Sequence, residues 1–524
     1  MKSYGYFRLR FNTIKYLTST QIFYQVFYRV KRMLRCKTSL GVTQYPGISK
    51  TVSMVDSIPA AESLKGSKFT FLNIEHDFEN QIDWNILNYG KLWAYNLNYF
   101  DYLNQRSITA NEANAILSSF LENCKNLLEG TEPYPISVRG INWIKYFIAN
   151  GIPDDRYNSL LYSHYRFLSR NLEFHLLGNH LLENGFSLLF ASVYFNDPGF
   201  GKIANTILRR ELKEQILDDG AHFELSPMYH NLILFRLLDC VNLLQNSNSP
   251  HSELKHFLEV KAAAMLGWIQ AVSFSNGDCP MVNDSAFGIA PATSALVEYG
   301  RRLGIVAREN RLHSSGYRMI RFADVELFVD VGHIGPDYIP GHAHSDTFNF
   351  VLYKKGVPFI VDTGTSTYES NERRRLERST RSHNTVMLGD IEQSEVWGSF
   401  RVGERAKVIK LDEQDRSIHA THDGYKAEGV YHHRRWQWVD KKLEIKDLLP
   451  RSTKEATAYL HFHPDVEVKL REHAIHAGEI TIRFEGARKI DLAAYEYATG
   501  FNQYKKATKA VIAFQNSLVT LLEL

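Results

Sequence analysis

The chain has 524 residues, 44% of them hydrophobic and 13% aromatic, and its 61 Lys and Arg against 58 Asp and Glu leave a formal charge of +3. This apolar content and small net charge exclude an intrinsically disordered chain, and they give no electrostatic reason to expect nucleic acid as a partner. At about 100–200 residues per domain, the length predicts two to four domains, each able to bury a core.

Residues 1–80 are predicted to form an N-terminal accessory segment. Its first 35 residues are rich in Arg, Lys and Tyr but lack the apolar stretch and cleavage site of a secretory signal. A cytoplasmic location is therefore the default expectation, and periplasmic location or secretion by a non-standard route stays open. Residues 23–32 suit a basic amphipathic helix, either lying on a membrane surface or, as we favour, packing its aromatic side on the body of the protein. No stretch approaches the length of an apolar membrane span.

Residues 81–314 have the apolar periodicity of helices, whereas residues 315–524 have the texture of strands. Leu182, Phe186 and Leu189 recur at spacings of four and three, and residues 234–244 show the same kind of spacing. Beyond residue 315, short apolar runs are broken by Gly, Asp and Asn, which is typical of stacked antiparallel sheets. The sequence therefore predicts an α+β multidomain chain, in which a helical array precedes an antiparallel β-sandwich.

The densest polar cluster is the segment His342-Ala343-His344, and Asp362 and His383 follow it. In an extended chain His342 and His344 would point to the same face. Two imidazoles and a carboxylate suit a Zn²⁺-type ion, but polar residues at strand ends that merely cap a sandwich are the alternative. The spacing by itself leaves both interpretations open.

Two further clusters lie in the helical region. Asn179 and Glu183 would sit one turn apart with His180 beside Glu183, at the start of an apolar helix where burying them is costly unless they bond one another or a ligand. In the second cluster, after Glu224, Ser226-Pro227 fits a helix N-cap and first helical position. Tyr229 then falls in the first turn, where the positive helix end would favour a tyrosinate. For each cluster, capping or packing is the structural alternative.

Aromatic residues alternate with Asn and Arg in residues 92–100 and 134–143. Rings stack on pyranose faces and Arg can bind a carboxylate or sulfate with two hydrogen bonds, so these segments suit a sugar-acid site. Packing between helices is the alternative for most individual rings. The candidates are Tyr95, Asn98, Arg139, Asn142 and Trp143.

Together, these residues resemble the heparinase II/III-like polysaccharide lyases, a superfamily that also contains alginate and oligo-alginate lyases. The resemblance covers roughly residues 85–450 and rests on residues 93–100, 179–180, 224–229, 342–344, 361–364 and 383–385. It implies an incomplete (α/α) toroid followed by an antiparallel β-sandwich.

The resemblance also implies roles for individual residues. Asn179 and His180 would bind and neutralise a uronate carboxylate. Tyr229 would protonate the leaving glycosidic oxygen and could also take the C5 proton, with His342 as the base for the opposite epimer. A structural divalent metal ion, Zn²⁺ or Mn²⁺ above all, would be held by His344, Asp362 and His383. Substrate contacts are expected from Tyr95, Asn98, Arg139, Asn142, Trp143, Glu183, Glu224 and Arg378.

The expected function is therefore β-elimination of an anionic, uronate-containing polysaccharide. Glycosaminoglycans such as hyaluronan, chondroitin or heparan sulfate are favoured over alginate because Arg373, Arg374, Arg375, Arg378 and Arg381 form a basic run. The alternatives are an alginate or oligo-alginate lyase, a metal-dependent hydrolase, and a non-catalytic protein of surface-polysaccharide assembly. The sequence predicts no oligomeric state.

Overall fold

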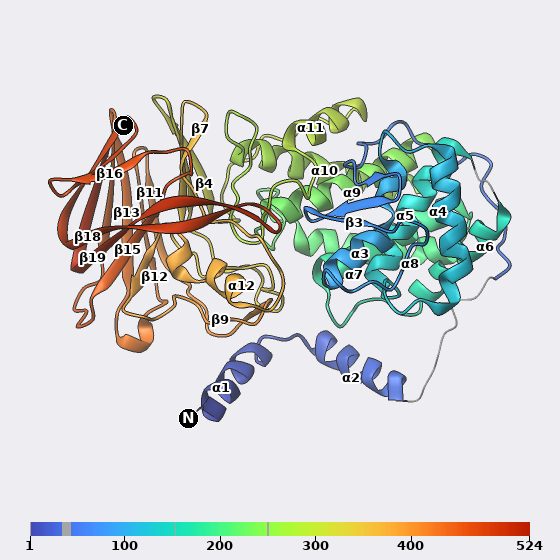
Figure 1. The fold of residues 1–524 in the computed structure, drawn as a ribbon, viewed down its shortest axis with the longest axis horizontal. Coiled ribbons are helices and arrows are strands. Elements are labelled where there is room, and N and C mark those ends of the chain that lie inside the picture. Colours follow the sequence, from blue (N-terminus) through green and yellow to red (C-terminus); the bar gives the residue numbers. More distant parts are fainter. Residues whose placement is uncertain (1, 34–42, 152–153, 249–250) are drawn as a thin grey trace.

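The structure is a computed structural model that describes residues 2–33, 43–151, 154–248 and 251–524 (Figure 1). Two helices and a small antiparallel sheet open the chain: α1 Lys2–Ile14, α2 Ser19–Met33, β1 Leu64–Lys65, β2 Lys68–Phe71 and β3 Ile74–Asp77. Within these described ranges, no helix is long and apolar enough to cross a membrane.

A helical region follows, which we call the helical half. Its helices are α3 Lys91–Tyr99, α4 Ala110–Asn123, α5 Pro133–Asn150, α6 Asp155–Leu168, α7 Gly178–Tyr194, α8 Pro198–Gln215, α9 Pro227–Asn246, α10 Ser252–Val272 and α11 Thr293–Arg302, with short 3₁₀ turns at Asp101–Asn104 and Cys124–Asn126. Several begin at signals the sequence carries: a Thr109–Glu112 capping box starts α4, and proline occupies the first turn of α5, α8 and α9. The helix predicted from Leu182, Phe186 and Leu189 is confirmed as α7, which is buried along almost its whole length.

The C-terminal region, which we call the sheet half, is antiparallel. Strands β4 Tyr317–Phe322, β5 Val325–Asp330, β6 Phe350–Lys354 and β7 Val357–Ile360 form one sheet in that order. A second, ten-stranded sheet has the path β11-β12-β13-β14-β19-β18-β17-β16, and β15 joins β19 to β8. Both sheets contribute side chains to one apolar core, separate from that of the helical half.

The remaining elements of the sheet half are short apart from one hairpin. Their bounds are α12 Glu372–Glu377, 3₁₀ turns Thr380–Ser382 and Lys426–Glu428, β8 Val386–Leu388, β9 Val396–Trp397, β10 Arg401–Val402, β11 Val408–Gln414, β12 Ser417–His422, β13 His432–Val439, β14 Lys442–Leu448, β15 Ala456–His461, β16 Val468–Arg471, β17 Ala474–Ala477, β18 Ile480–Gly500 and β19 Gln503–Glu523.

The β18–β19 hairpin is far longer than the short strands expected beyond residue 315. Each strand has 21 residues, and much of β18 is exposed, so its sequence shows little apolar alternation. The hairpin reaches back to the small β1–β3 sheet near the start of the chain (Figure 1). There Asn73 donates to the carbonyl of Phe501 over 2.9 Å, and Asn502 donates to that of Leu72 over 2.9 Å.

The change from helix to strand lies between Arg302, where α11 ends, and Tyr317, where β4 begins. The domain limits 1–80, 81–314 and 315–524 themselves stay a prediction. This junction positions the site described next, because the site draws its residues from both halves.

Candidate functional site

Tyr229 and His342 form the centre of the site. Helix α9 begins at Pro227, and the Ser226 hydroxyl accepts a hydrogen bond from the Tyr229 amide over 3.3 Å, which confirms the predicted cap. The Tyr229 ring stacks on the His342 imidazole with centroids 3.9 Å apart. His342 lies in the connection between β5 and β6, so this pair joins the helical half to the sheet half.

Asp284 anchors the catalytic candidates from a buried position between α10 and α11. Its carboxylate accepts from His342 Nδ1 over 2.9 Å and from His344 Nε2 over 2.9 Å, and it forms a bidentate ion pair with Arg374. Burial opposes its charge, but Arg374 and the two imidazoles hold the pKa of Asp284 well below its ordinary value. An ionised Asp284 keeps the proton of His342 on Nδ1, which leaves Nε2 free to accept a proton.

His342 and His344 lie in a turn and loop before β6, and the expected extended strand is absent there. Their rings contact different neighbours: the His342 ring stacks on Tyr229, whereas the His344 ring lies 5.3 Å from the His383 ring. The expectation that both would point the same way from a strand is therefore wrong. They are brought together instead by their shared acceptor, Asp284.

Glu224 and Asn179 present unpaired polar atoms beside His342. Glu224 Oε1 accepts from the Asn179 backbone N–H over 3.4 Å, and Glu224 Oε2 lies 3.4 Å from His342 Nε2. Burial raises the pKa of Glu224. Within the described part of the chain, the buried atoms Asn179 Oδ1 and Glu224 Oε2 have no hydrogen-bond partner, which is costly unless a ligand or water supplies one.

His180 is the exposed cation of the site. Its Nδ1 lies 3.1 Å from Glu173 Oε1, its ring contacts Tyr134 with centroids 4.7 Å apart, and 38% of its side chain is exposed. Burial favours the neutral ring, but the carboxylate of Glu173, with Glu224 and Glu183, raises the pKa of His180. The acidic neighbours therefore favour the protonated form of this imidazole at the start of α7.

Tyr229 is a neutral phenol in this environment. Burial, the adjacent Tyr368 hydroxyl and the Asp284 carboxylate raise its pKa well above the ordinary value. The expectation that the helix N-terminus favours a tyrosinate is wrong, because burial and these neighbours outweigh the helix dipole. Tyr229 is thus suited to give a proton to a leaving oxygen.

Two family models match the chain. The model described as "Heparinase II/III N-terminus" matches residues 147–298, and the one described as "Heparinase II/III-like, C-terminal" matches residues 305–520. Together they cover most of the sequence in the order expected. The chain belongs to the heparinase II/III-like superfamily.

Individual relatives of this heparinase II/III-like chain agree with that result. A curated heparin-sulfate lyase of Pedobacter heparinus is 25% identical over 317 residues, which is 55% of this chain and 46% of the relative. The match therefore spans less than half of that relative.

Among solved structures, heparinase III covers 85% of this chain and 79% of its own with 17% identity and a TM-score of 0.66. A heparan sulfate lyase mutant from Pedobacter heparinus covers 87% and 81% with 17% identity and a TM-score of 0.59. A chondroitinase AC lyase covers 85% and 77% with 8% identity and a TM-score of 0.51. At these identities the structural likeness shows a shared fold.

Four residues expected to contact substrate are instead part of the core of the heparinase II/III-like chain. Asn98 and Asn142 donate to backbone carbonyls and, in the case of Asn142, to the Asp101 carboxylate. Arg139 is fully buried, donates to the carbonyls of Asn98 and Gly130, and lies over the Phe120 ring. Trp143 is also fully buried. These expectations are wrong because α3 buries Asn98 and α5 buries Arg139, Asn142 and Trp143 away from solvent.

Glu183 and the arginine run are likewise engaged within the protein. Glu183 is buried and pairs with Arg236 over 2.9 Å. Arg378 is buried and donates to the Ala343 carbonyl, and Arg374 pairs with Asp284. Arg373 pairs with Glu377 and Glu496. The structure therefore does not support Glu183 or Arg378 as substrate contacts, and most of the run's charge is neutralised internally.

Tyr95 is half-buried at one end of a row of rings that leads to His180. Successive ring centroids are 6.1 Å apart from Tyr95 to Tyr99, 6.1 Å from Tyr99 to Tyr134, and 4.7 Å from Tyr134 to His180. Helices α3, α5 and α7 supply these rings. Such a row suits stacking against sugar rings.

The predicted metal ligands lie next to one another beneath Asp284. His383 Nδ1 is 2.8 Å from Asp362 Oδ2, which also accepts from Asn349 over 2.6 Å. His344 Nδ1 and His383 Nε2 are buried and have no hydrogen-bond partner among the residues that the structure describes. These two orphaned nitrogens beside a carboxylate fit a divalent cation in donor type. Yet no three His, Cys, Asp or Glu side chains in the described ranges are arranged to hold a metal as they stand.

Three residues that support the site were not predicted from the sequence: Glu173, Asp284 and Tyr368. Glu173 and Asp284 lie in connections between helices, where one acidic residue carries no periodic signal. Tyr368 precedes the arginine run, and no motif there gives it a role. In the structure its pKa is raised well above the ordinary value by burial and Asp284, and its hydroxyl neighbours Tyr229.

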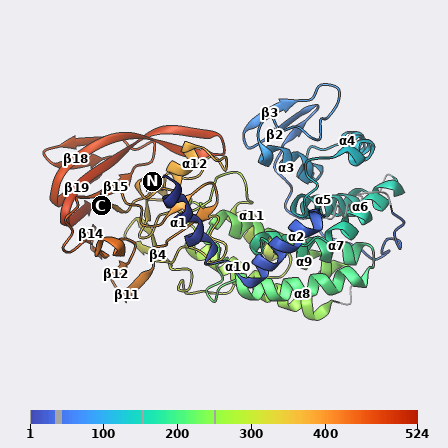
Figure 2. The ribbon, with the colours of Figure 1, turned by 90° about the horizontal axis from the view of Figure 1, so that it is seen from below.

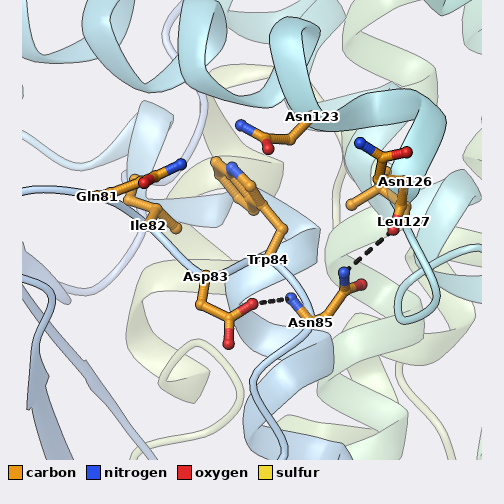
Figure 3. Close-up of a pocket in the computed structure, with 8 residues that line it drawn as sticks. All are labelled: Gln81, Ile82, Asp83, Trp84, Asn85, Asn123, Asn126 and Leu127. Carbon is orange, nitrogen blue, oxygen red and sulfur yellow. Dashed lines mark hydrogen bonds between the residues drawn. The ribbon is translucent and has the colours of Figure 1, made fainter.

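A separate pocket of about 290 Å³ lies on the helical half (Figure 3). Trp84, Asn85 and Asn123 are among its lining residues, and Asn85 donates to the Asn126 carbonyl over 3.1 Å. None of the site residues described above lines it. It therefore has no part in the chemistry proposed below.

Proposed function

We propose that this protein is a polysaccharide lyase that cleaves a uronate-containing glycosaminoglycan by β-elimination. The observation that carries the proposal is the stack of a neutral Tyr229 on a His342 whose Nδ1 is held by ionised Asp284. This arrangement offers a proton acceptor and a proton donor side by side, which is what elimination across C4–C5 requires.

The first step is removal of the C5 proton of the uronate. His342 Nε2 accepts that proton, since Tyr229 is neutral in this environment, and the electron pair is delocalised into the carboxylate. Asn179 and protonated His180 stabilise the carboxylate charge, which makes C5 acidic enough to react. The electron pair then forms the C4–C5 double bond as the C4–O bond breaks. Tyr229 protonates the departing oxygen, and no water is consumed.

The preference for glycosaminoglycan is supported by what the relatives are named for, a heparin-sulfate lyase among them. The arginine run gives that preference less support than its sequence suggested, since Arg373, Arg374 and Arg378 are occupied by internal partners.

In finer detail, we propose that the helical half is an incomplete (α/α) toroid and the sheet half a β-sandwich.

A panel of purified uronate polymers tests the function. Hyaluronan, chondroitin, heparan sulfate and alginate are each incubated with the protein, and the ultraviolet absorbance of unsaturated uronide is followed. Absorbance with a glycosaminoglycan supports the proposal, and absorbance with alginate alone transfers it to alginate lyase. Chain shortening without absorbance would indicate a hydrolase, and binding without turnover a non-catalytic protein.

We also propose that His344, Asp362 and His383 hold a divalent cation, Zn²⁺ or Mn²⁺, in a structural role. The support is the pair of unpartnered imidazole nitrogens beside the Asp362 carboxylate. When bound, the ion would supply positive charge that fixes these three side chains. We expect chelator treatment to lower the melting temperature and one of the two ions to restore it. Elemental analysis that finds no metal, with no thermal response to either ion, would contradict this.

The alkaline limit of activity should depend on Glu173. The pKa of His180 is raised in the folded state. The positive charge of His180, and the stability that this charge brings, are therefore fully present below the ordinary pKa of histidine. Both are lost as pH rises through the folded-state pKa. We expect Glu173→Gln to move the alkaline limb of kcat/KM to lower pH and to lower the melting temperature more in acid than in alkali. Glu253→Gln, at an exposed position, should move neither. An unchanged alkaline limb would refute the role of His180.

A further inference from the structure

The two N-terminal helices expose apolar side chains on the side that faces away from the protein. α1 and α2 lie along one side of the molecule, α1 next to the sheet half and α2 next to the helical half (Figures 1 and 2). The exposed residues, between 45% and 79% accessible, form what we call the N-terminal apolar surface: Phe7, Phe11, Ile14, Ile22, Phe23, Val26, Phe27, Val30 and Met33.

The opposite face of α1 is anchored to the sheet half by polar contacts. Asn12 donates to Glu395 over 3.0 Å, and Trp397 Nε1 donates to the Thr13 hydroxyl over 3.1 Å. The Arg405 guanidinium lies 3.8 Å from the centroid of the Tyr16 ring. The spacing of Phe7, Phe11 and Ile14 therefore places them on the face that these contacts leave outside.

Helix α2 is attached to the helical half in the same way. Gln21 donates to the carbonyls of Leu176 and Tyr338, the Tyr24 ring stacks on Phe174 at 4.8 Å, and the Tyr28 hydroxyl bonds the Leu172 carbonyl. The favoured expectation, that the aromatic side packs on the body, is thus confirmed for the tyrosines and wrong for the phenylalanines. Ordinary surface helices bury their apolar stripe and expose the polar face, and α2 does the reverse.

The positive charge of the N-terminal residues indicates which kind of partner binds this surface. Residues 1–55 contain ten Lys or Arg and neither Asp nor Glu, although the whole chain carries only +3. Arg29 is exposed beside the apolar residues of α2. An exposed apolar surface with Arg29 beside it matches an anionic bilayer, whose headgroups attract the cation while the acyl boundary takes the rings. Exposed helices of this kind lie in the plane of the interface and need no spanning segment.

We propose that α1 and α2 dock this protein in the plane of an anionic lipid bilayer. This inference rests on the N-terminal helices alone and is independent of the proposed lyase activity. The surface formed by these helices lies outside the candidate site, and none of its residues takes part in the chemistry above.

Vesicle co-sedimentation with the full chain tests the proposal. The protein should sediment with vesicles of phosphatidylglycerol and phosphatidylcholine in equal parts, and much less with phosphatidylcholine alone. Phe23→Glu/Val30→Glu should weaken binding by about ten-fold or more, since it places charge in the acyl boundary. Arg29→Glu should weaken it less and in a salt-dependent way.

The matched control is Leu128→Glu/Val306→Glu, which adds the same charge at exposed apolar positions elsewhere on the surface. It should bind vesicles like the unaltered protein, and melting temperatures should show that all variants fold. Failure to bind anionic vesicles, or equal weakening by the control, would overturn the proposal. So would light scattering that shows a dimer in lipid-free solution which Phe23→Glu/Val30→Glu dissociates, because the occupant would then be a second copy of the chain.

Discussion

Tyr229→Phe is expected to reduce kcat/KM on the cleaved polymer by about 10²–10⁴-fold, the usual contribution of a general acid or base. The substitution removes only the hydroxyl, so the ring can keep its stack on His342 at 3.9 Å and its place in the first turn of α9. The loss should therefore appear in turnover, with an unchanged melting temperature. The measurement is the rate of unsaturated uronide formation.

The matched control for this substitution is Tyr431→Phe, at an exposed ring far along the chain, which should leave the rate unchanged. Activity of Tyr229→Phe close to that of the unaltered protein would remove Tyr229 from the mechanism. A loss of activity together with a lower melting temperature would mean that the hydroxyl supports packing, and the role in proton transfer would then lose its support.

Asp284→Asn is expected to affect both stability and activity. Its carboxylate is the partner of buried Arg374, and removing one member of a buried ion pair leaves an uncompensated charge, at a cost of about 3–5 kcal/mol in the free energy of unfolding. The same change removes the acceptor that orients His342. Denaturant unfolding and the uronide assay together measure the two effects.

A double variant separates the effect of Asp284→Asn on stability from its effect on activity. In Asp284→Asn/Arg374→Met the buried charge is gone as well, so much of the lost stability should return. Activity should stay low, because His342 still lacks its anchor. Glu298→Gln, which breaks an exposed pair with Arg301, should change neither quantity noticeably. Recovery of activity in the double variant would show that Asp284 serves only the fold.

Local signals in the sequence predicted the elements well wherever those signals were complete. Ser226 and Pro227 marked the start of α9, and the change to short apolar runs near residue 315 marked the place where β4 begins. Caps and apolar periodicity act over a few residues, so they can be recognised without any knowledge of the fold. The long hairpin of β18 and β19 was underestimated because its exposed stretch has little apolar alternation.

Burial was the property that the sequence could not supply. Arg139 and Trp143 have the composition of a sugar site, and only the packing of α5 shows that they are enclosed. Phe23 and Phe27 have the composition of a core, and the attachment of α2 through Gln21 and Tyr24 leaves them outside. In both cases the residue type does not reveal burial, and the side on which each helix is held decides it.

By itself, the sequence determined the order of helices and strands, the family, and the candidates Asn179, His180, Tyr229 and His342. Tertiary structure alone decided which polar groups meet. Asp284 lies in a connection between helices, yet it binds His342 and His344 from the next region of the chain and Arg374 from beyond them. Contacts between residues so far apart in sequence depend on how the two halves pack against each other, and no local pattern of residues encodes that packing.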